Sequence, residues 1–151
     1  MNGDGEGATG PGPMRILETC LYAADVDRCA DFYATVFGFP VTGRAHDRHV
    51  FLRCGDGMLL IFNPSATERP GGEVPPHGAR GPGHVAFAVH EGRLPHWRDH
   101  LDRLGVEVER EVSWPRGGSS LYLRDPAGNS VEVTTPGIWG IESGVLVRSP
   151  E

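Results

Sequence analysis

Three side chains of this 151-residue chain have the chemistry of a divalent-metal site, namely Glu18, His84 and Glu132. One imidazole and two carboxylates suit iron, manganese, nickel, cobalt or zinc as divalent ions. Three protein ligands leave coordination positions open for water or substrate oxygens, as Lewis-acid catalysis requires. Each residue alone also fits an ordinary role, as a hydrogen-bonded core histidine or as a solvated strand carboxylate. Because His84 and Glu132 occupy matching places in a repeated pattern, we favour ligation for both. We extend it to Glu18, because an unpaired carboxylate lining a barrel would be costly to desolvate.

Strand alternation gives an independent test of this site, because side chains two positions apart share one face of a strand. His84 alternates with Val85 and Phe87, which are suited to lie under a helix. Glu132 stands between Val131 and Val133, and Glu18 stands between Leu17 and Thr19. We therefore expect all three candidates on the face that points away from the helices.

The same order of elements occurs twice along the chain. A strand over 16–23, a helix over 26–38 begun by Asp25 and ended by Gly38, and strands over 39–43, 49–54 and 58–63 form the first unit. The second unit has a strand over 83–89, a helix over 94–104, and strands over 106–112, 120–124 and 130–134. Residue landmarks repeat as well, since Glu18 and His84 lie 66 positions apart and the two helix-ending glycines lie 67 apart. Internal duplication explains these offsets better than coincidence.

This duplication divides the chain into five parts. Residues 1–14 are rich in glycine and predict a disordered tail. Residues 15–63 form the first module, 64–82 a Pro/Gly-rich linker, 83–135 the second module and 136–151 a C-terminal tail.

Residues 15–135 resemble the vicinal oxygen chelate superfamily, which contains glyoxalases, bleomycin-resistance proteins and extradiol dioxygenases. The resemblance is carried by three segments, ILETCLYAADVDRCADFYATVFGFPV, GHVAFAV and SLYLRDPAGNSVEV. It implies an α+β fold in which two βαβββ modules pair into an open, curved mixed β-barrel with helices outside. The resemblance also implies a divalent metal that polarises vicinal substrate oxygens, and it strengthens the assignment of Glu18, His84 and Glu132.

Two departures from the family pattern narrow the chemistry. The position of Glu18 is more often His or Gln in the family. The repeat aligns Ile61 with Glu132, at a place where members similar to glyoxalase I carry a fourth ligand. Because Ile61 cannot coordinate an ion, we expect a mechanism different from that of glyoxalase I. A match to the extradiol dioxygenases or the fosfomycin-resistance enzymes is also incomplete.

Other side chains are expected to line the same cavity. Tyr122 is a candidate proton donor that would act with Glu132 as a catalytic residue, although simple strand packing explains it equally well. The candidate substrate contacts are Tyr22, His49, Phe51, His77 and Trp114. For His77, an exposed loop histidine is the competing interpretation.

Composition excludes several classes of partner. The chain carries 14 basic and 20 acidic residues, a net charge of −6, with no basic cluster, so we expect no nucleic-acid partner. It has no long apolar segment or signal core, so we expect no membrane partner. Three cysteines without paired spacing favour a cytoplasmic protein. The family resemblance implies a homodimer, with modules paired within one chain or exchanged between subunits.

Two functions from different classes remain open at this stage. The first is a metal-dependent enzyme, a lyase or isomerase or a dioxygenase, that chelates a small oxygen-rich substrate through two oxygens. The second is a metal-free binding protein of the bleomycin-resistance type that sequesters a drug or metabolite. A third possibility, a structural module, explains nothing specific about the predicted cavity.

Overall fold

The computed structural model describes residues 10–142 and contains two units with the same order of elements. The first unit consists of β1 Glu18–Tyr22, α1 Val26–Phe37, β2 Val41–Ala45, β3 His49–Cys54 and β4 Gly57–Phe62. The second consists of β5 His84–Ala88, α3 Leu94–Arg103, β6 Arg110–Ser113, β7 Ser119–Arg124 and β8 Ser130–Thr134. A short helix, α2 Pro64–Thr67, lies between the units, and a 3₁₀ turn, η1 Pro136–Trp139, follows the second.

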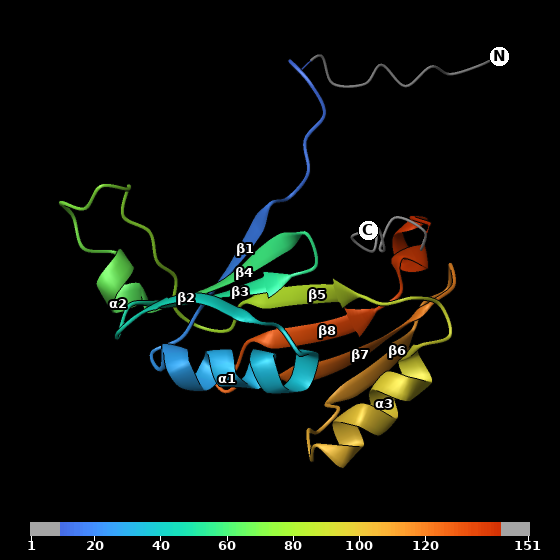
Figure 1. The fold of residues 1–151 in the computed structure, drawn as a ribbon. Helices are drawn as coiled ribbons and strands as arrows, with labels where there is room; N and C mark the ends of the chain where they lie inside the picture. Colours follow the sequence, from blue (N-terminus) through green and yellow to red (C-terminus); the bar gives the residue numbers. More distant parts are fainter. Residues whose placement is uncertain (1–9, 143–151) are drawn as a thin grey trace.

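Each unit forms one four-stranded mixed sheet, and the two sheets have the same topology. The strand orders are β1-β4-β3-β2 and β5-β8-β7-β6, with β1 parallel to β4 and β5 parallel to β8. The sheets are not closed into a barrel, and α1 and α3 lie on one side of them (Figure 1). The predicted α+β class, with two βαβββ modules and an open sheet arrangement, is confirmed.

The core lies between the helices and the sheets. The core contains Cys29, Tyr33 and Val36 of α1 and Leu101 of α3. It also contains inward-facing sheet residues such as Val131 and Val133. Local sequence explains the bounds of α1. Asp25 accepts a hydrogen bond from the Arg28 amide at 3.0 Å, and Gly38 takes the left-handed conformation with φ of 71°. Both roles were predicted.

The DPAGN turn between β7 and β8 joins the two modules. The Tyr33 hydroxyl donates to the buried Asp125 carboxylate at 2.8 Å, and the Asn129 amide group donates to the same carboxylate at 2.8 Å. Asn129 also accepts from the Gly83 amide at 2.7 Å and donates to the Tyr22 carbonyl at 3.3 Å. One turn therefore ties α1, the end of β1 and the start of β5 together.

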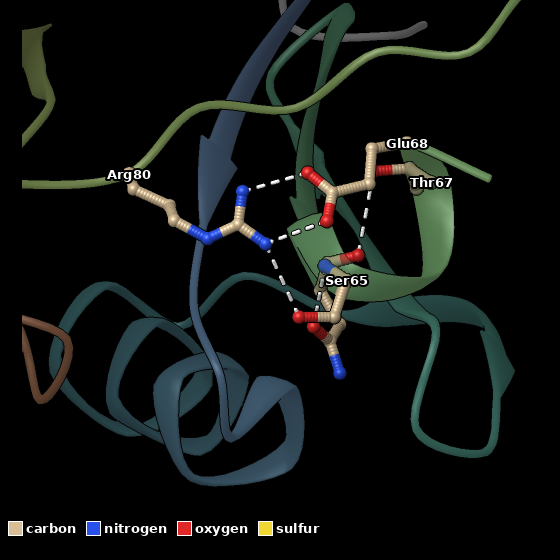
Figure 2. A network of polar contacts seen from close by, with 5 residues as sticks. Ser65, Thr67, Glu68 and Arg80 are labelled. Carbon is tan, nitrogen blue, oxygen red and sulfur yellow. Dashed lines mark hydrogen bonds and ion pairs between the residues drawn. The ribbon is translucent and has the colours of Figure 1, made fainter.

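The linker after β4 is held against the first module and is not structureless. Its first residues form α2, a helix that was not predicted from sequence. Asn63 caps this helix by accepting from the Ser65 amide at 3.0 Å. Figure 2 shows the Arg80 guanidinium bonded to both oxygens of Glu68, at 2.6 and 2.7 Å, and to the Ser65 hydroxyl at 3.3 Å. The far end of the linker is thereby fixed to α2.

Several element bounds differ from those predicted. β1 begins at Glu18, because regular pairing with β4 starts there. Before it, the Leu17 carbonyl accepts one bond from the Met58 amide. β6 begins at Arg110, since regular pairing with β7 starts there. Parts of both predicted tails, residues 1–9 and 143–151, lie outside the described residues. Between residues 10 and 142, no helix has the length and apolar character needed to cross a membrane.

Candidate functional site

His84 and Glu132 form the centre of the candidate site on the face of the second sheet that the helices leave open. His84 starts β5 and Glu132 lies in the neighbouring strand β8, which brings the His84 Nε2 atom within 3.3 Å of the Glu132 Oε2 atom. The His84 side chain is about half exposed, whereas Glu132 is 5% exposed. Alternation along β5 and β8 thus places both groups on the predicted face.

A backbone contact fixes the imidazole of His84. Its Nδ1 atom lies 3.1 Å from the Ser130 carbonyl oxygen, which can only accept, so Nδ1 carries the proton. The Nε2 atom of a neutral ring then directs a lone pair at the Glu132 carboxylate. Two electron-rich atoms at this distance require a cation between them, either a proton or a metal ion.

The spacing suits a shared metal ion. Two ligands at the usual bond lengths of about 2.0–2.2 Å lie about 2.8–3.6 Å apart on an octahedral or tetrahedral ion. The observed 3.3 Å falls in this range. A ligating histidine that donates its other N–H to a carbonyl is also the usual outer-shell arrangement. His84 and Glu132 therefore fit two ligands of one divalent ion.

The other oxygen of Glu132 is held by a chain of buried hydroxyl groups. Ser120, which is fully buried, donates to Glu132 Oε1, lies 2.8 Å from the Thr134 hydroxyl and accepts from the Trp114 indole N–H at 2.8 Å. The candidate substrate contact Trp114 is thus connected to Glu132, the candidate metal ligand, through one serine. These bonds give the buried carboxylate of Glu132 a hydrogen-bond partner in place of water and fix its orientation.

Glu18 does not join His84 and Glu132 within a single chain. In the part of the chain that is described, no three His, Cys, Asp or Glu side chains are grouped to hold one ion. Glu18 instead holds the place in the first sheet that His84 holds in the second. Glu18 pairs with Met58 on β4 just as His84 pairs with Ser130 on β8.

The strand register corrects one feature of the repeat. Tyr122 pairs with Glu132, and its counterpart Phe51 pairs with Leu60, not with Ile61. The alignment of Ile61 with Glu132 was therefore wrong by one residue, because five residues separate the paired Arg124 and Ser130 whereas four separate the equivalent pair, Arg53 and Met58. Ile61 is fully buried in the core. The first module still offers no ligand at the position equivalent to Glu132, since Leu60 cannot coordinate an ion either.

Tyr122 lies directly beside Glu132 across the β7–β8 pairing. Desolvation raises the pKa of its phenol, and the negative charge of Glu132 raises it further. Tyr122 therefore keeps its proton at neutral pH and presents a hydrogen-bond donor next to the candidate metal ligand.

Aromatic rings cover the open face of the first sheet. The Tyr22 hydroxyl lies 2.7 Å from His77 Nδ1, and the His77 ring meets Phe62 edge to face at 4.8 Å. His49 stacks on Phe51 with ring centroids 4.1 Å apart. Burial lowers the pKa of His49, as does the nearby Arg48 charge. Four predicted substrate contacts, Tyr22, His49, Phe51 and His77, thus gather around Phe62, while Trp114 directly follows β6 of the second sheet.

Three residues on the open faces of the two sheets were not predicted as part of the site: Ser120 and Thr134 on the second sheet and Phe62 on the first. Ser120 and Thr134 share the Glu132 face by simple alternation, so the signal was present. Phe62 was hidden because it ends a continuous apolar run, GMLLIF, in which alternation is not visible.

Comparisons with known proteins agree with this architecture. The family model of the Glyoxalase/Bleomycin resistance protein/Dioxygenase superfamily matches residues 15–133. The chain is 26% identical over 145 residues to a lactoylglutathione lyase of Pseudomonas putida, covering 78% of this chain and 83% of the relative.

Solved structures show the same similarity. A lactoylglutathione lyase from Agrobacterium tumefaciens superposes with a TM-score of 0.82 at 40% identity, covering 85% of this chain and 98% of that one. A glyoxalase/bleomycin resistance protein/dioxygenase from Nocardioides has a TM-score of 0.67 at 17% identity, covering 84% and 86% of the two chains, and supports the fold alone. The chain belongs to the Glyoxalase/Bleomycin resistance protein/Dioxygenase superfamily.

Proposed function

We propose that this protein is a metal-dependent enzyme that binds a small oxygen-rich substrate through two of its oxygens. The observation that carries this proposal is the 3.3 Å contact between His84 Nε2 and Glu132 Oε2, with the imidazole proton fixed on Nδ1. The similarity to two lactoylglutathione lyases favours a lyase or isomerase over a dioxygenase.

Each residue of the proposed site has a separate role. His84, Glu132 and Glu18 would hold an iron, manganese, nickel, cobalt or zinc ion, which supplies Lewis acidity to substrate oxygens. Tyr122, protonated at neutral pH, donates a hydrogen bond to a substrate oxygen beside Glu132. Glu132 is the carboxylate that exchanges a proton with the substrate, and the Ser120 hydroxyl keeps it oriented.

Glu18 would reach the other two ligands from a second copy of the chain. A two-fold axis places the same surface of both copies in contact, so the first sheet of one copy can face the second sheet of the other. This pairing sets Glu18 opposite His84 and Glu132. It also sets the aromatic contacts Tyr22, His49, Phe51 and His77 opposite Tyr122 and Trp114, so that one cavity has an apolar and a polar wall.

Removal of His84 tests the proposed metal site. We expect His84→Ala to lose its bound metal after dialysis against a mild chelator, as measured by elemental analysis, while the wild type retains it. His46→Ala is the matched control, because His46 also lies beside a carboxylate, 3.2 Å from Asp47, but both side chains are more than four-fifths exposed. Equal metal content in His84→Ala and wild type would overturn the proposal.

A metal-free binding protein of the bleomycin-resistance type is the second candidate. The observation that favours it is the aromatic cluster around Phe62. In such a protein a proton, not a metal ion, joins His84 to Glu132. In that case the wild type binds no metal after incubation with each of the five ions and dialysis. NMR spectra of the metal-free protein at neutral pH should then show the His84 ring as an imidazolium.

A further inference from the structure

A row of side chains crosses the open face of the second sheet from β5 to β6. Ala86 pairs with Glu132, Glu132 pairs with Tyr122, and Tyr122 pairs with Arg110. Residues paired in this way point to the same face of a sheet, and neighbouring strands are about 4.8 Å apart. Arg110 therefore stands about 10 Å from Glu132 on the same face, with the Tyr122 phenol between them.

A cavity lies at the Arg110 end of this row. Its volume is about 430 Å³, and its lining residues are Glu109, Arg110, Val112, Tyr122, Arg124 and Ser130. Tyr122 and Ser130 both belong to the candidate site, because Ser130 also holds the His84 ring. The cavity is thus the extension of that site toward the β6 edge.

The charge of this cavity is positive, although the chain as a whole carries −6. Arg124 bonds both oxygens of Glu109, at 2.9 and 3.3 Å, and so neutralises the one acidic residue in the lining. Arg110 has no ion pair or side-chain hydrogen bond to any residue between 10 and 142. One guanidinium thus remains available, beside a phenol that can donate a second hydrogen bond.

The first module lacks this arrangement. The row equivalent to Ala86, Glu132, Tyr122 and Arg110 consists of Cys20, Leu60, Phe51 and Gly43. Every polar group of the row is therefore specific to the second module. Fold alone does not require an arginine here, since the same strand position in the first sheet is a glycine.

We propose that Arg110 binds an anionic group of the substrate, a carboxylate or a phosphate, while the oxygens of the same molecule lie at His84 and Glu132. This inference rests on the proposed function for the position of those oxygens. It adds the substrate class, a small molecule with an acidic group about 10 Å from its chelating oxygens, which corresponds to two strand spacings. A planar guanidinium recognises either anion with two parallel hydrogen bonds.

Anion binding can be measured on the full chain after removal of metal with EDTA, so that no anion can bind to an ion. One arm titrates inorganic phosphate and the other propionate, at constant ionic strength set with chloride, with the arginine Nε–H signals followed by NMR. We expect saturable binding of at least one anion, and a loss of affinity of about tenfold or more in Arg110→Gln. Arg116→Gln is the matched control, because Arg116 is an exposed arginine outside the row; it should bind like the wild type.

The two arms identify the source of the anionic group. Tighter phosphate binding assigns a phosphorylated substrate, and tighter propionate binding assigns a carboxylic acid. Equal affinity of Arg110→Gln and wild type, or no saturable binding of either anion by the wild type, would overturn the proposal.

Metal content of the same samples separates this test from that of the proposed function. Arg110→Gln should retain the wild-type metal content before EDTA treatment, whereas His84→Ala should lose it. If the wild type itself holds no metal, the proposed function fails, but the titration still decides whether Arg110 binds an anion.

Discussion

Glu132 is a buried carboxylate with a different partner at each oxygen. His84 lies at one oxygen, and the Ser120 hydroxyl donates to the other. Because charges are rarely buried without such partners, the hydroxyl chain below Glu132 makes it possible for a carboxylate to stay ordered at the site. Ser120 is the residue on which this chain depends.

Replacement of Ser120 by alanine should therefore destabilise the protein. Glu132, Thr134 and Trp114 would each lose a buried partner, which predicts a loss of about 1–3 kcal/mol in the free energy of unfolding. Chemical denaturation measures this loss as a lower midpoint, and the m-value should stay unchanged. Ser119→Ala is the control, since its hydroxyl makes one exposed contact of 3.4 Å with Ser113 and should cost less than about 0.5 kcal/mol. Equal midpoints for the two variants would contradict this role of Ser120.

At the scale of elements, the strands and helices that position the site follow from periodicity. Alternation placed His84 and Glu132 on the open face, and Asp25 and Gly38 marked the ends of α1. The helix α2 was missed because four residues are too few for a periodic pattern, although Asn63 followed by Pro64 is a helix-start signal. The equivalence of Leu60 and Glu132 in the two modules was missed, because the length of the turn before each strand is decided by backbone conformation within the turn.

The turn before β8 should matter more for stability than an ordinary loop. Asn129 is 1% exposed and bonds Gly83, Tyr22 and Asp125, which belong to three different segments. We expect Asn129→Ala to lower the free energy of unfolding by about 2–4 kcal/mol, because it leaves buried backbone groups without partners.

Asn63→Ala provides the comparison for this variant. Asn63 also accepts from a backbone amide, at the start of α2, and its side chain donates to the Asp47 carbonyl at 3.0 Å, but both of these bonds are exposed to solvent. Its loss should cost about 1 kcal/mol. Thermal denaturation of both variants measures the difference, and a milder effect in Asn129→Ala than in Asn63→Ala would refute the role of the turn in joining the modules.

At the scale of the whole molecule, the duplicated chain has two open faces of opposite character. The first sheet presents Glu18 and aromatic rings, and the second presents His84, Glu132, Tyr122 and Arg110. Sequence predicted these residues except Arg110. It contains no signal for which faces meet, since a module can pair within its own chain or with a second copy. Among the described residues, the candidate ligands His84 and Glu132 lie together and Glu18 lies on the other sheet, which is why we propose pairing between copies.

A mixing experiment tests this shared metal site most directly. Glu18→Ala and His84→Ala are each expected to bind no metal alone. After denaturation and refolding together in equal amounts, half of the dimers carry one chain of each kind, and one of their two sites is intact. Elemental analysis should then find about a quarter of the wild-type metal content. Metal bound by Glu18→Ala alone, or none bound by the refolded mixture, would contradict a site built from Glu18 of one copy and His84 with Glu132 of the other.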